Sequence, residues 1–494
     1  MLKKDINLNS EVENKMDNVR LIYTIVLVGY LLFMLIIGYI TSKKINSEES
    51  FFVADRSLGF IVSLGTFAAT FVSSSSIIGY VGWLYSVGWS GMWAIGGTIS
   101  SVIIGSLFLM GKLRECGENT IPDVFASRYY DKKVKIIPII LILLMYIVFI
   151  TVEIMGAGKV LNSLLGMNYD IAVIVTAAVF VFYTMSGGMY AVAWTDLFQA
   201  IMGFGFVIAS IFVALNKVGG FTQMNIKLAQ IDPSLVSPIT GSISSAVIFI
   251  MWNHLVWGTG NISQPAVIVR ALSAKDVKTA KMSTAWSGIV FVLFYFSLMI
   301  LAGTSKILYP NLKDVDLAFP VLIQNLYHPI IGGLLISSII AIIMSTADSV
   351  LLVVGSTISK DLYKDFIKPH ASVEEIVKIS RIAIIGVGML SALFALTKPA
   401  PILSLQIFNY STIGAAFFIP MMVGFYWKRA TREGAIASMV GGALANLLWY
   451  WLKKPLGLDP IIPGLVVGLV LIYVVSMLSP TPPEYVIEKF FGND

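Results

Sequence analysis

Residues 65–83 read GTFAATFVSSSSIIGYVGW, an apolar segment in which four consecutive serines, Ser73 to Ser76, interrupt a run long enough for a helix. Serine hydroxyls compete with the backbone for the hydrogen bonds of a helix. We therefore expect a helix that breaks near these serines. The surroundings decide what the break means, because unpaired backbone is tolerated in water but is costly inside a bilayer.

The composition of the chain places this segment in a membrane. The chain has 494 residues, of which 57% are hydrophobic and 13% charged, and its mean hydropathy is +0.84. Apolar windows of about 20 residues, the length that crosses a bilayer, recur with short connections between them. We predict an all-α integral membrane protein with thirteen transmembrane helices. The helices are expected near residues 20–42, 58–86, 90–112, 134–164, 170–186, 191–216, 242–270, 277–305, 329–360, 374–397, 400–427, 431–452 and 461–480.

Basic residues gather in four of the predicted connections, at 112–135, 270–281, 360–381 and 428–432. All four connections fall on the same side of the membrane if the helices alternate in direction. An excess of Lys and Arg marks short cytoplasmic loops. We therefore expect a multi-pass protein of the cell membrane, with its N-terminus outside and its C-terminus in the cytoplasm.

A second broken helix is expected at residues 252–270, WNHLVWGTGNISQPAVIVR, where Gly258, Gly260 and Pro265 weaken the helix. After the first helix is set aside, the two broken helices open two successive groups of five. Paired discontinuous helices in corresponding positions indicate an inverted-repeat transporter with its binding site near the bilayer midplane. The single transporter domain, 1–494, then comprises an extra N-terminal helix at 20–42, five-helix units at 58–216 and 242–427, and two C-terminal helices at 431–480.

A polar cluster lies inside the apolar stretch AIIMSTADSVLLVV at residues 341–354. Ser345, Thr346, Asp348 and Ser349 offer hydroxyl and carboxylate oxygens, which suit a hard cation better than a soft one. The alternative is that the hydroxyls only join neighbouring membrane helices by hydrogen bonds. The carboxylate favours a cation site.

Three more ionisable groups fall inside predicted membrane helices, where such groups are expensive and usually functional. Asp196 lies early in its helix and also suits a helix cap. His254 is interpreted as a hydrogen-bonded packing residue. Glu153 lies beside small residues and is consistent with a neutral carboxyl, a proton carrier or a substrate contact.

Trp257, Asn261 and Gln264 recur at spacings of four and three residues, which places them on one face of a helix. Such a face suits the wall of a site for a small polar solute, and ordinary core packing is the alternative. One cysteine, Cys116, and three histidines leave no Cys/His metal cluster. No nucleophile–base pair, organic cofactor motif or nucleic-acid-binding pattern is evident, so an enzyme is not expected.

Five blocks in the sequence resemble the sodium:solute symporter family, which contains sodium-coupled transporters for proline, pantothenate, monocarboxylates, sugars and sialic acid. The blocks are FFVADRSLGF (51–60), TIPDVFASRY (120–129), YTMSGGMYAVAWTDLFQA (183–200), WGTGNISQPAVIVRALSAKD (257–276) and AIIMSTADSVLLVVGSTISKDLY (341–363). The resemblance implies a leucine-transporter-type fold of two inverted five-helix repeats and coupling to inward Na⁺. The expected partners are therefore Na⁺, a small solute and the lipid bilayer, whereas the sequence leaves the oligomeric state open.

The resemblance also implies roles for particular residues. The main sodium site of the family matches the carbonyls of Ala69, Val72 and Ile342 and the hydroxyls of Ser345 and Thr346. A second cation site, present in some members, corresponds to Asp196, Asp348 and Ser349. Arg56 matches an arginine in the loop before the first broken helix. The candidate solute-binding residues are Ser73, Ser76, Phe149, Glu153, Trp257, Asn261 and Gln264.

The sequence departs from the proline transporters of the family at the expected solute site. They carry an aspartate where this chain has Phe71, and tyrosines where it has Phe149 and Asn261, whereas Trp257 is shared. We expect Na⁺-coupled symport of a small carboxylate-bearing solute, such as an amino acid like proline, a monocarboxylate or pantothenate. The alternatives are a proton-coupled symporter and a Na⁺/sugar symporter of the same family.

Overall fold

The computed structural model describes residues 2–42, 47–239 and 243–492. Within these ranges the regular structure is helical, and one isolated bridge joins Leu58 to Ala274. The helices are α1 (Leu2–Ser42), α2 (Glu48–Val53), α3 (Phe60–Phe71), α4 (Tyr80–Val87), α5 (Trp93–Ile104), α6 (Met110–Cys116), α7 (Ile121–Arg128), α8 (Ile136–Leu165), α9 (Tyr169–Val218), α10 (Phe221–Ile231), α11 (Ile243–Asn253), α12 (Pro265–Ser273), α13 (Val277–Leu308), α14 (Ala318–Leu326), α15 (Pro329–Ser356), α16 (Val373–Thr397), α17 (Ile402–Tyr426), α18 (Arg432–Trp451), α19 (Ile461–Leu478) and α20 (Glu484–Phe491). Wider π-helical turns form η2 (Ser75–Gly79), η4 (Gly105–Leu109), η7 (His254–Gly260) and η9 (Thr357–Ile367).

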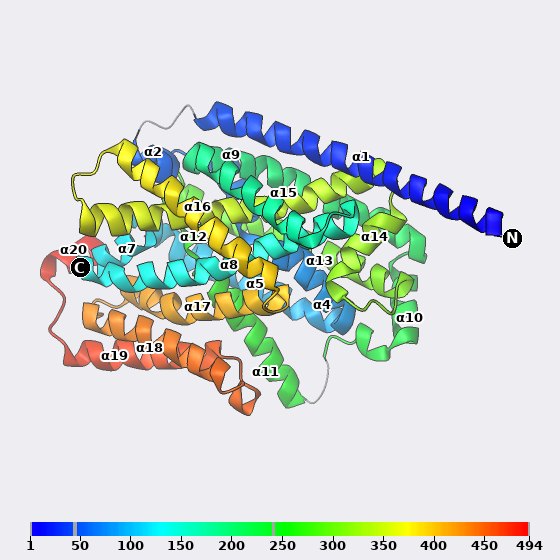
Figure 1. Ribbon diagram of the computed structural model, residues 1–494. Coiled ribbons are helices and arrows are strands. Elements are labelled where there is room, and N and C mark those ends of the chain that lie inside the picture. The colour runs from blue at the N-terminus through cyan, green and yellow to red at the C-terminus, as the bar shows by residue number, and fades with distance from the viewer. Residues whose placement is uncertain (1, 43–46, 240–242, 493–494) are drawn as a thin grey trace.

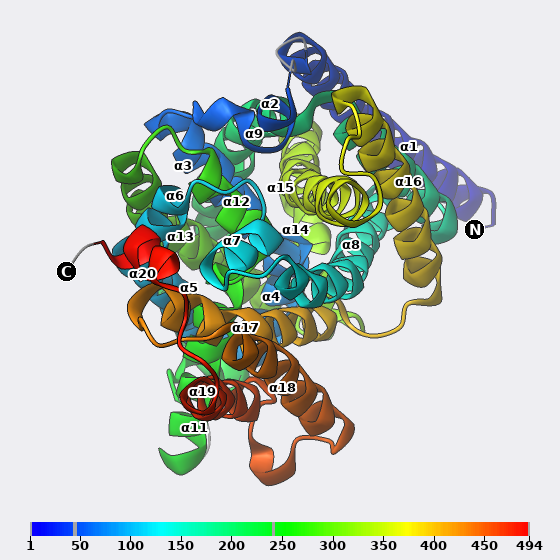
Figure 2. The ribbon, with the colours of Figure 1, turned by 90° about the vertical axis from the view of Figure 1, so that its left-hand side faces the viewer.

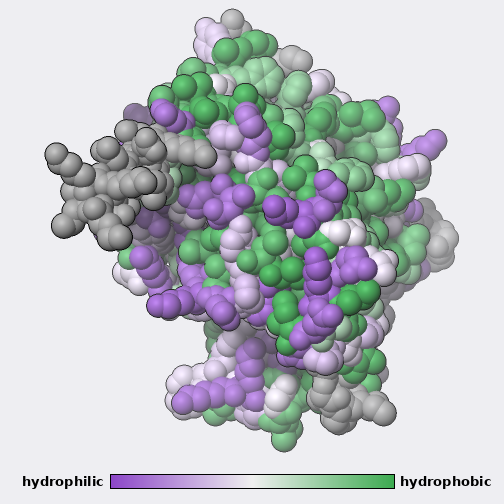
Figure 3. Space-filling model, turned by 90° about the vertical axis from the view of Figure 1, so that its right-hand side faces the viewer, coloured by the Kyte–Doolittle hydropathy of each residue, from purple (hydrophilic) through white to green (hydrophobic). Residues whose placement is uncertain are grey.

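The helices pack as one bundle whose long members run roughly side by side (Figure 1). Helix α1 lies along the outside of the bundle, against α9 and α15, and α18 and α19 pair on another side (Figure 1). Seen end-on, α7 and α20 cover one end of the bundle (Figure 2). The opposite end, which carries α10 and α14, shows hydrophilic side chains among hydrophobic ones (Figure 3). Large apolar side chains are exposed along α1 and α19, as expected for helices that face lipid.

Nine helical segments of the described residues are long and apolar enough to cross a bilayer. The sequence predicts thirteen membrane helices. Several of the predicted helices that are not among the nine are too short or too interrupted to meet the length expected of a membrane-crossing helix. Helix α3 has 12 residues, the apolar helix at Tyr169–Met185 is also short, and α18 lies outside the nine. The all-helical membrane class is therefore confirmed, whereas the count of thirteen stays a prediction.

The helix predicted to break near the four serines does break there. Helix α3 ends at Phe71, and Val72 is extended, with φ −98° and ψ 128°. The chain becomes helical again at Ser74, and η2 begins at Ser75. Because the ladder stops at Phe71, the last carbonyls of α3 have no partner in their own helix.

The second predicted break lies immediately before Pro265. Gln264 is extended, with φ −65° and ψ 125°, because the proline ring disfavours the α conformation of the preceding residue. Upstream, η7 replaces regular helix around Gly258 and Gly260. A third interruption is Gly188 within α9, with φ 54° and ψ −165°. In the sequence this residue falls between the helices predicted at 170–186 and 191–216.

Close helix crossings depend on glycine at a few positions. A Cβ at Gly442 of α18 would collide with the carbonyl oxygen of Ala415 in α17 and lie 3.1 Å from that of Gly464 in α19. By contrast, nothing lies within 4 Å of a Cβ built at Gly386 in α16. The crossing of α17, α18 and α19 therefore requires a residue without a side chain at Gly442.

Substituting valine at these two glycines tests this packing. We expect Gly442→Val to lower the free energy of unfolding by about 1–3 kcal/mol, the usual cost of overpacking. The matched variant Gly386→Val should change it by less than about 0.5 kcal/mol, because its side chain meets open space. Equilibrium unfolding in mixed detergent micelles measures both. Equal losses in the two variants would contradict the close crossing.

Candidate functional site

The break after α3 lies against the middle of α15, where Ser345 and Thr346 reach its free carbonyls. The Thr346 hydroxyl oxygen is 2.5 Å from the carbonyl oxygen of Val72 and 3.2 Å from that of Ala69. The Ser345 hydroxyl oxygen is 3.2 Å from the Ala69 carbonyl oxygen and 2.8 Å from that of Ile342. All five residues predicted for the main sodium site are buried, and their oxygens meet at one point.

This group of oxygens has the chemistry that a hard cation requires. The two hydroxyl groups can donate only two protons to the three carbonyl oxygens. Lone pairs on these oxygens therefore stay free to bind a cation. Ala69 lies in the last turn of α3 and Val72 follows its end, where the helix dipole adds negative potential. No sulfur or imidazole belongs to the group. The residues present therefore fit Na⁺, which prefers oxygen ligands.

The three residues predicted for a second cation site do not share one set of partners: Asp196 and Ser349 contact Arg270, and Asp348 contacts Thr184. The Asp196 Oδ2 accepts hydrogen bonds from Thr66 Oγ1 at 2.5 Å and from Arg270 Nη2 at 3.0 Å. Arg270 also donates to the Ser349 hydroxyl. Asp348 instead accepts a hydrogen bond from Thr184 in α9, at 2.7 Å. A guanidinium thus already contacts two of the three predicted ligands.

Arg270 is a buried residue of this region that the sequence pattern does not identify as part of the site. The sequence places it at the start of the predicted basic connection 270–281, yet it lies in α12, is only 2% exposed and forms an ion pair with Asp196. Because α12 begins at Pro265, Arg270 falls in its second turn and points back into the bundle. Its position inside the block WGTGNISQPAVIVRALSAKD was the available signal.

Two of the residues predicted to bind solute, Phe149 and Trp257, pack against Tyr410 of α17. The Tyr410 ring meets the ring of Trp257 edge-on, with centroids 5.4 Å apart, and that of Phe149 at 5.9 Å. Glu153 lies one turn after Phe149 on α8 and accepts a hydrogen bond from the backbone N–H of Ser74 at 2.9 Å. Tyr410 was not among the predicted residues.

The remaining predicted solute-binding residues are partly engaged within the protein. Ser73 bonds Ser75, and the Ser76 hydroxyl lies 3.0 Å from that of Tyr295 in α13. The Asn261 amide donates to the carbonyl of Trp257 in its own helix. The Gln264 amide donates to Asn409, while its Oε1 is buried without a partner. Buried polar groups are normally paired, so the Gln264 Oε1 keeps the capacity to accept a further hydrogen bond.

Arg56 does not approach this region. It hydrogen-bonds Glu49 at 2.7 Å, and it donates to the loop between α6 and α7 through Gly117 and Asn119, each at 2.6 Å. These contacts fasten the loop before α3 to the neighbouring loop. Arg56 therefore holds the start of the broken helix in place from outside the site.

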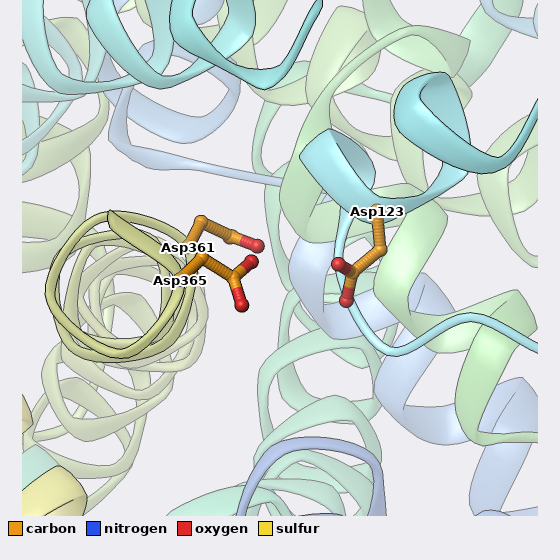
Figure 4. A group of neighbouring side chains, drawn as sticks. All are labelled: Asp123, Asp361 and Asp365. Atoms are coloured by element: carbon orange, nitrogen blue, oxygen red, sulfur yellow. The ribbon is translucent and has the colours of Figure 1, made fainter. Parts of the chain in front are cut away.

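Three carboxylates at the end of the bundle that carries α7 form a separate cluster. Asp123 of α7 points toward Asp361 and Asp365 of η9 (Figure 4). Lys135 forms ion pairs with all three, and Lys360 pairs with Asp123. The lysine ammonium groups supply the positive charge that a metal ion would bring. We therefore interpret this cluster as an ion-pair network that joins α7 to η9.

An all-helical membrane bundle with two broken helices and a buried oxygen-rich site defines a membrane transporter. The chain belongs to the sodium:solute symporter family, whose model matches residues 51–442. The sodium/proline symporter of Escherichia coli (strain K12) is 32% identical over 491 residues, which cover 94% of this chain and 95% of that protein. The osmoregulated proline transporter OpuE of Bacillus subtilis (strain 168) is 30% identical over 469 residues, covering 92% and 94%.

Solved structures show the same fold. A Na⁺-coupled sialic acid symporter in a substrate-bound outward-open state superimposes with a TM-score of 0.80, at 20% identity, over 93% of this chain and 98% of that one. The nucleobase-cation-symport transporter Mhp1 in a closed conformation gives a TM-score of 0.60 at 14% identity, covering 90% and 98%. The chain is thus a multi-pass membrane protein of a transporter family.

A double-mutant cycle tests the buried ion pair. Arg270→Met should lower the free energy of unfolding by about 3–5 kcal/mol, because it leaves Asp196 as a buried charge without its cation. Arg270→Met combined with Asp196→Asn should recover a large part of this loss, since the second change removes that charge. Equilibrium unfolding in detergent measures Arg270→Met, Asp196→Asn and the double variant. Purely additive losses would show that the two side chains do not form a pair.

Proposed function

We propose that the protein is a Na⁺-driven symporter that moves a small carboxylate-bearing solute into the cell by alternating access. The observation that carries the proposal is the meeting of the α3 carbonyls with the hydroxyls of α15. Na⁺ would be bound by the carbonyls of Ala69, Val72 and Ile342 and the hydroxyls of Ser345 and Thr346. The family membership and the names of the relatives, which are sodium/proline symporters and proline transporters, support this function.

The coupling follows from the position of the ion at the break. Na⁺ held there would tie α3 to α15 and fix the extended backbone at Val72, next to the serines and Glu153 of the solute region. Binding of either species then favours the other, and the two couplings are equal by thermodynamic linkage. One charge moving through about 100 mV releases about 2.3 kcal/mol, enough for about 50-fold accumulation of solute.

The architecture proposed for this cycle is the one expected from the sequence. It has thirteen membrane helices, with inverted five-helix units at 58–216 and 242–427, in the cell membrane. The four basic connections support an N-terminus outside and a cytoplasmic C-terminus. Arg270 contacts two of the candidate second-site ligands, so a second cation at Asp196, Asp348 and Ser349 would require that ion pair to open.

Proton coupling is the second candidate, because Glu153 and Asp348 each have one buried carboxylate oxygen without a partner. Such groups can exchange a proton during a transport cycle. This alternative requires solute accumulation in sodium-free proteoliposomes under an inward proton gradient. The Na⁺-driven mechanism requires that accumulation to be absent until Na⁺ is added.

Alanine at Ser345 tests the ion site without knowledge of the solute. We expect Ser345→Ala to raise the Na⁺ concentration that half-maximally stabilises the purified protein by about tenfold, because one oxygen ligand is lost. The measurement is a thermal-shift titration with NaCl, in which KCl keeps the ionic strength constant.

Ser337→Ala is the matched control for this titration. Ser337 is also buried in α15, but its hydroxyl donates to the carbonyl of Gly333 in its own helix. Its removal should leave the Na⁺ midpoint unchanged. The assignment of the ion site is wrong if Ser345→Ala and Ser337→Ala give the same midpoint as the unmodified protein.

A further inference from the structure

Glu153 is a fully buried carboxylate in contact with the break in the first broken helix. Its Oε2 accepts the backbone N–H of Ser74 at 2.9 Å, and the Ser74 hydroxyl donates to the carbonyl of Val152 at 3.1 Å. A Cβ at Gly156 would collide with the side chain of Ser74, so α8 packs closely against the chain at the break. The position of the carboxylate is thus fixed on the surface of the break.

The second oxygen of this carboxylate, Oε1, is buried and has no hydrogen-bond partner. Among the residues whose side chains the structure describes, which are 16–40, 47–185, 187–239 and 247–492, none forms an ion pair with Glu153. The nearby cations are engaged elsewhere, since Lys159 of the same helix binds Asp314 and Asp316 and Arg270 binds Asp196. A buried carboxylate without a cation is expensive, so its retention calls for a positively charged partner or a proton.

A group of aromatic rings adjoins the turn of α8 that precedes Glu153. Phe149 precedes Glu153 by one helical turn, and the ring of Tyr410 lies edge-on to those of Phe149 and Trp257, with interplanar angles of 73° and 81°. Aromatic faces attract alkylammonium groups, and several rings around one carboxylate form the usual surroundings of a bound ammonium ion.

The same region also offers a donor for the other end of a zwitterion. The indole N–H of Trp257 is buried without a partner. An indole N–H can donate to a carboxylate, whereas Glu153 can only accept hydrogen bonds when ionised. A simple monocarboxylate would leave Glu153 without a cation and would add a second negative charge close to it. A neutral sugar would also leave Glu153 uncompensated.

We propose that Glu153 determines substrate specificity by binding a positively charged ammonium group of the solute, within the ring group of Phe149, Trp257 and Tyr410. The solute is then a small zwitterion, an amino acid or a related ammonium carboxylate, rather than a monocarboxylate, pantothenate or a sugar. This inference rests on the proposed symport function, and it narrows the solute class. Since Glu153 also binds Ser74, the ammonium would be connected to the backbone of the break.

Three isosteric pairs of solutes test this inference. Each pair shares a carboxylate and a shape, and only one member carries the ammonium: L-proline and tetrahydrofuran-2-carboxylate, L-alanine and L-lactate, glycine betaine and 3,3-dimethylbutanoate. Their apparent affinities are measured by thermal-shift titration of the full-length protein in NaCl and again in KCl. We expect at least one ammonium member to bind about tenfold or more tightly than its partner in NaCl.

Glu153→Gln is the decisive variant, because its amide oxygen can still accept from Ser74 while the negative charge is lost. It should reduce the within-pair preference to about threefold or less. A ratio measured on one protein is unaffected by a general loss of stability. Asp170→Asn removes a carboxylate from the exposed start of α9 and should leave the ratio unchanged.

The outcomes separate this inference from the function on which it rests. Equal binding within every pair, a preference that survives Glu153→Gln, or binding by none of the ammonium compounds would overturn the role of Glu153. Binding of an ammonium compound that is the same in NaCl and KCl would leave the role of Glu153 standing and contradict Na⁺ coupling. Loss of the preference in Glu153→Gln, with binding that requires Na⁺, supports both.

Discussion

The packing of the bundle depends on the hydrogen-bond partners of the backbone carbonyls at the point where α3 ends inside it. Ala69 lies in the last turn of α3 and Val72 is the extended residue after it, and both residues are buried. The hydroxyls of Ser345 and Thr346 reach them from α15, a helix almost 280 residues further along the chain. An unpaired carbonyl in such a place is costly, so the break and α15 must stay in contact or exchange their contact for a cation.

Other parts of the bundle keep this contact in position. Thr66 and Thr70 of α3 join Asp196 and Ser349, and Arg270 of α12 binds both of these residues. On the other side, Glu153 and Gly156 of α8 hold the chain just after the break. Elements from both halves of the sequence thus meet at one short stretch of extended backbone. A transporter requires a place where several helices meet, because binding or release of a ligand there changes the contacts of all of these helices.

The sequence was informative where a residue type conflicts with its surroundings. Four serines in an apolar run predicted the break at Val72, and hydroxyls in 341–354 predicted the partner helix. The reading failed where only the three-dimensional fold decides. Arg270 looked like a loop residue because it ends an apolar run, and only the start of α12 at Pro265 turns it inward. Tyr410 gave no signal, since an aromatic residue in an apolar helix is ordinary, and its role comes from neighbours in α8 and η7.

The most direct test of the central claim is an experimental density map of the protein, determined at high resolution in NaCl and again in KCl. If Na⁺ binds at the break, the NaCl map shows a peak that is surrounded by the carbonyl oxygens of Ala69, Val72 and Ile342 and the hydroxyls of Ser345 and Thr346. That peak should be missing in KCl, where the two hydroxyls donate directly to the carbonyls. Hydroxyls that still donate to Ala69 and Val72 in NaCl, with no peak between these oxygens, would contradict it.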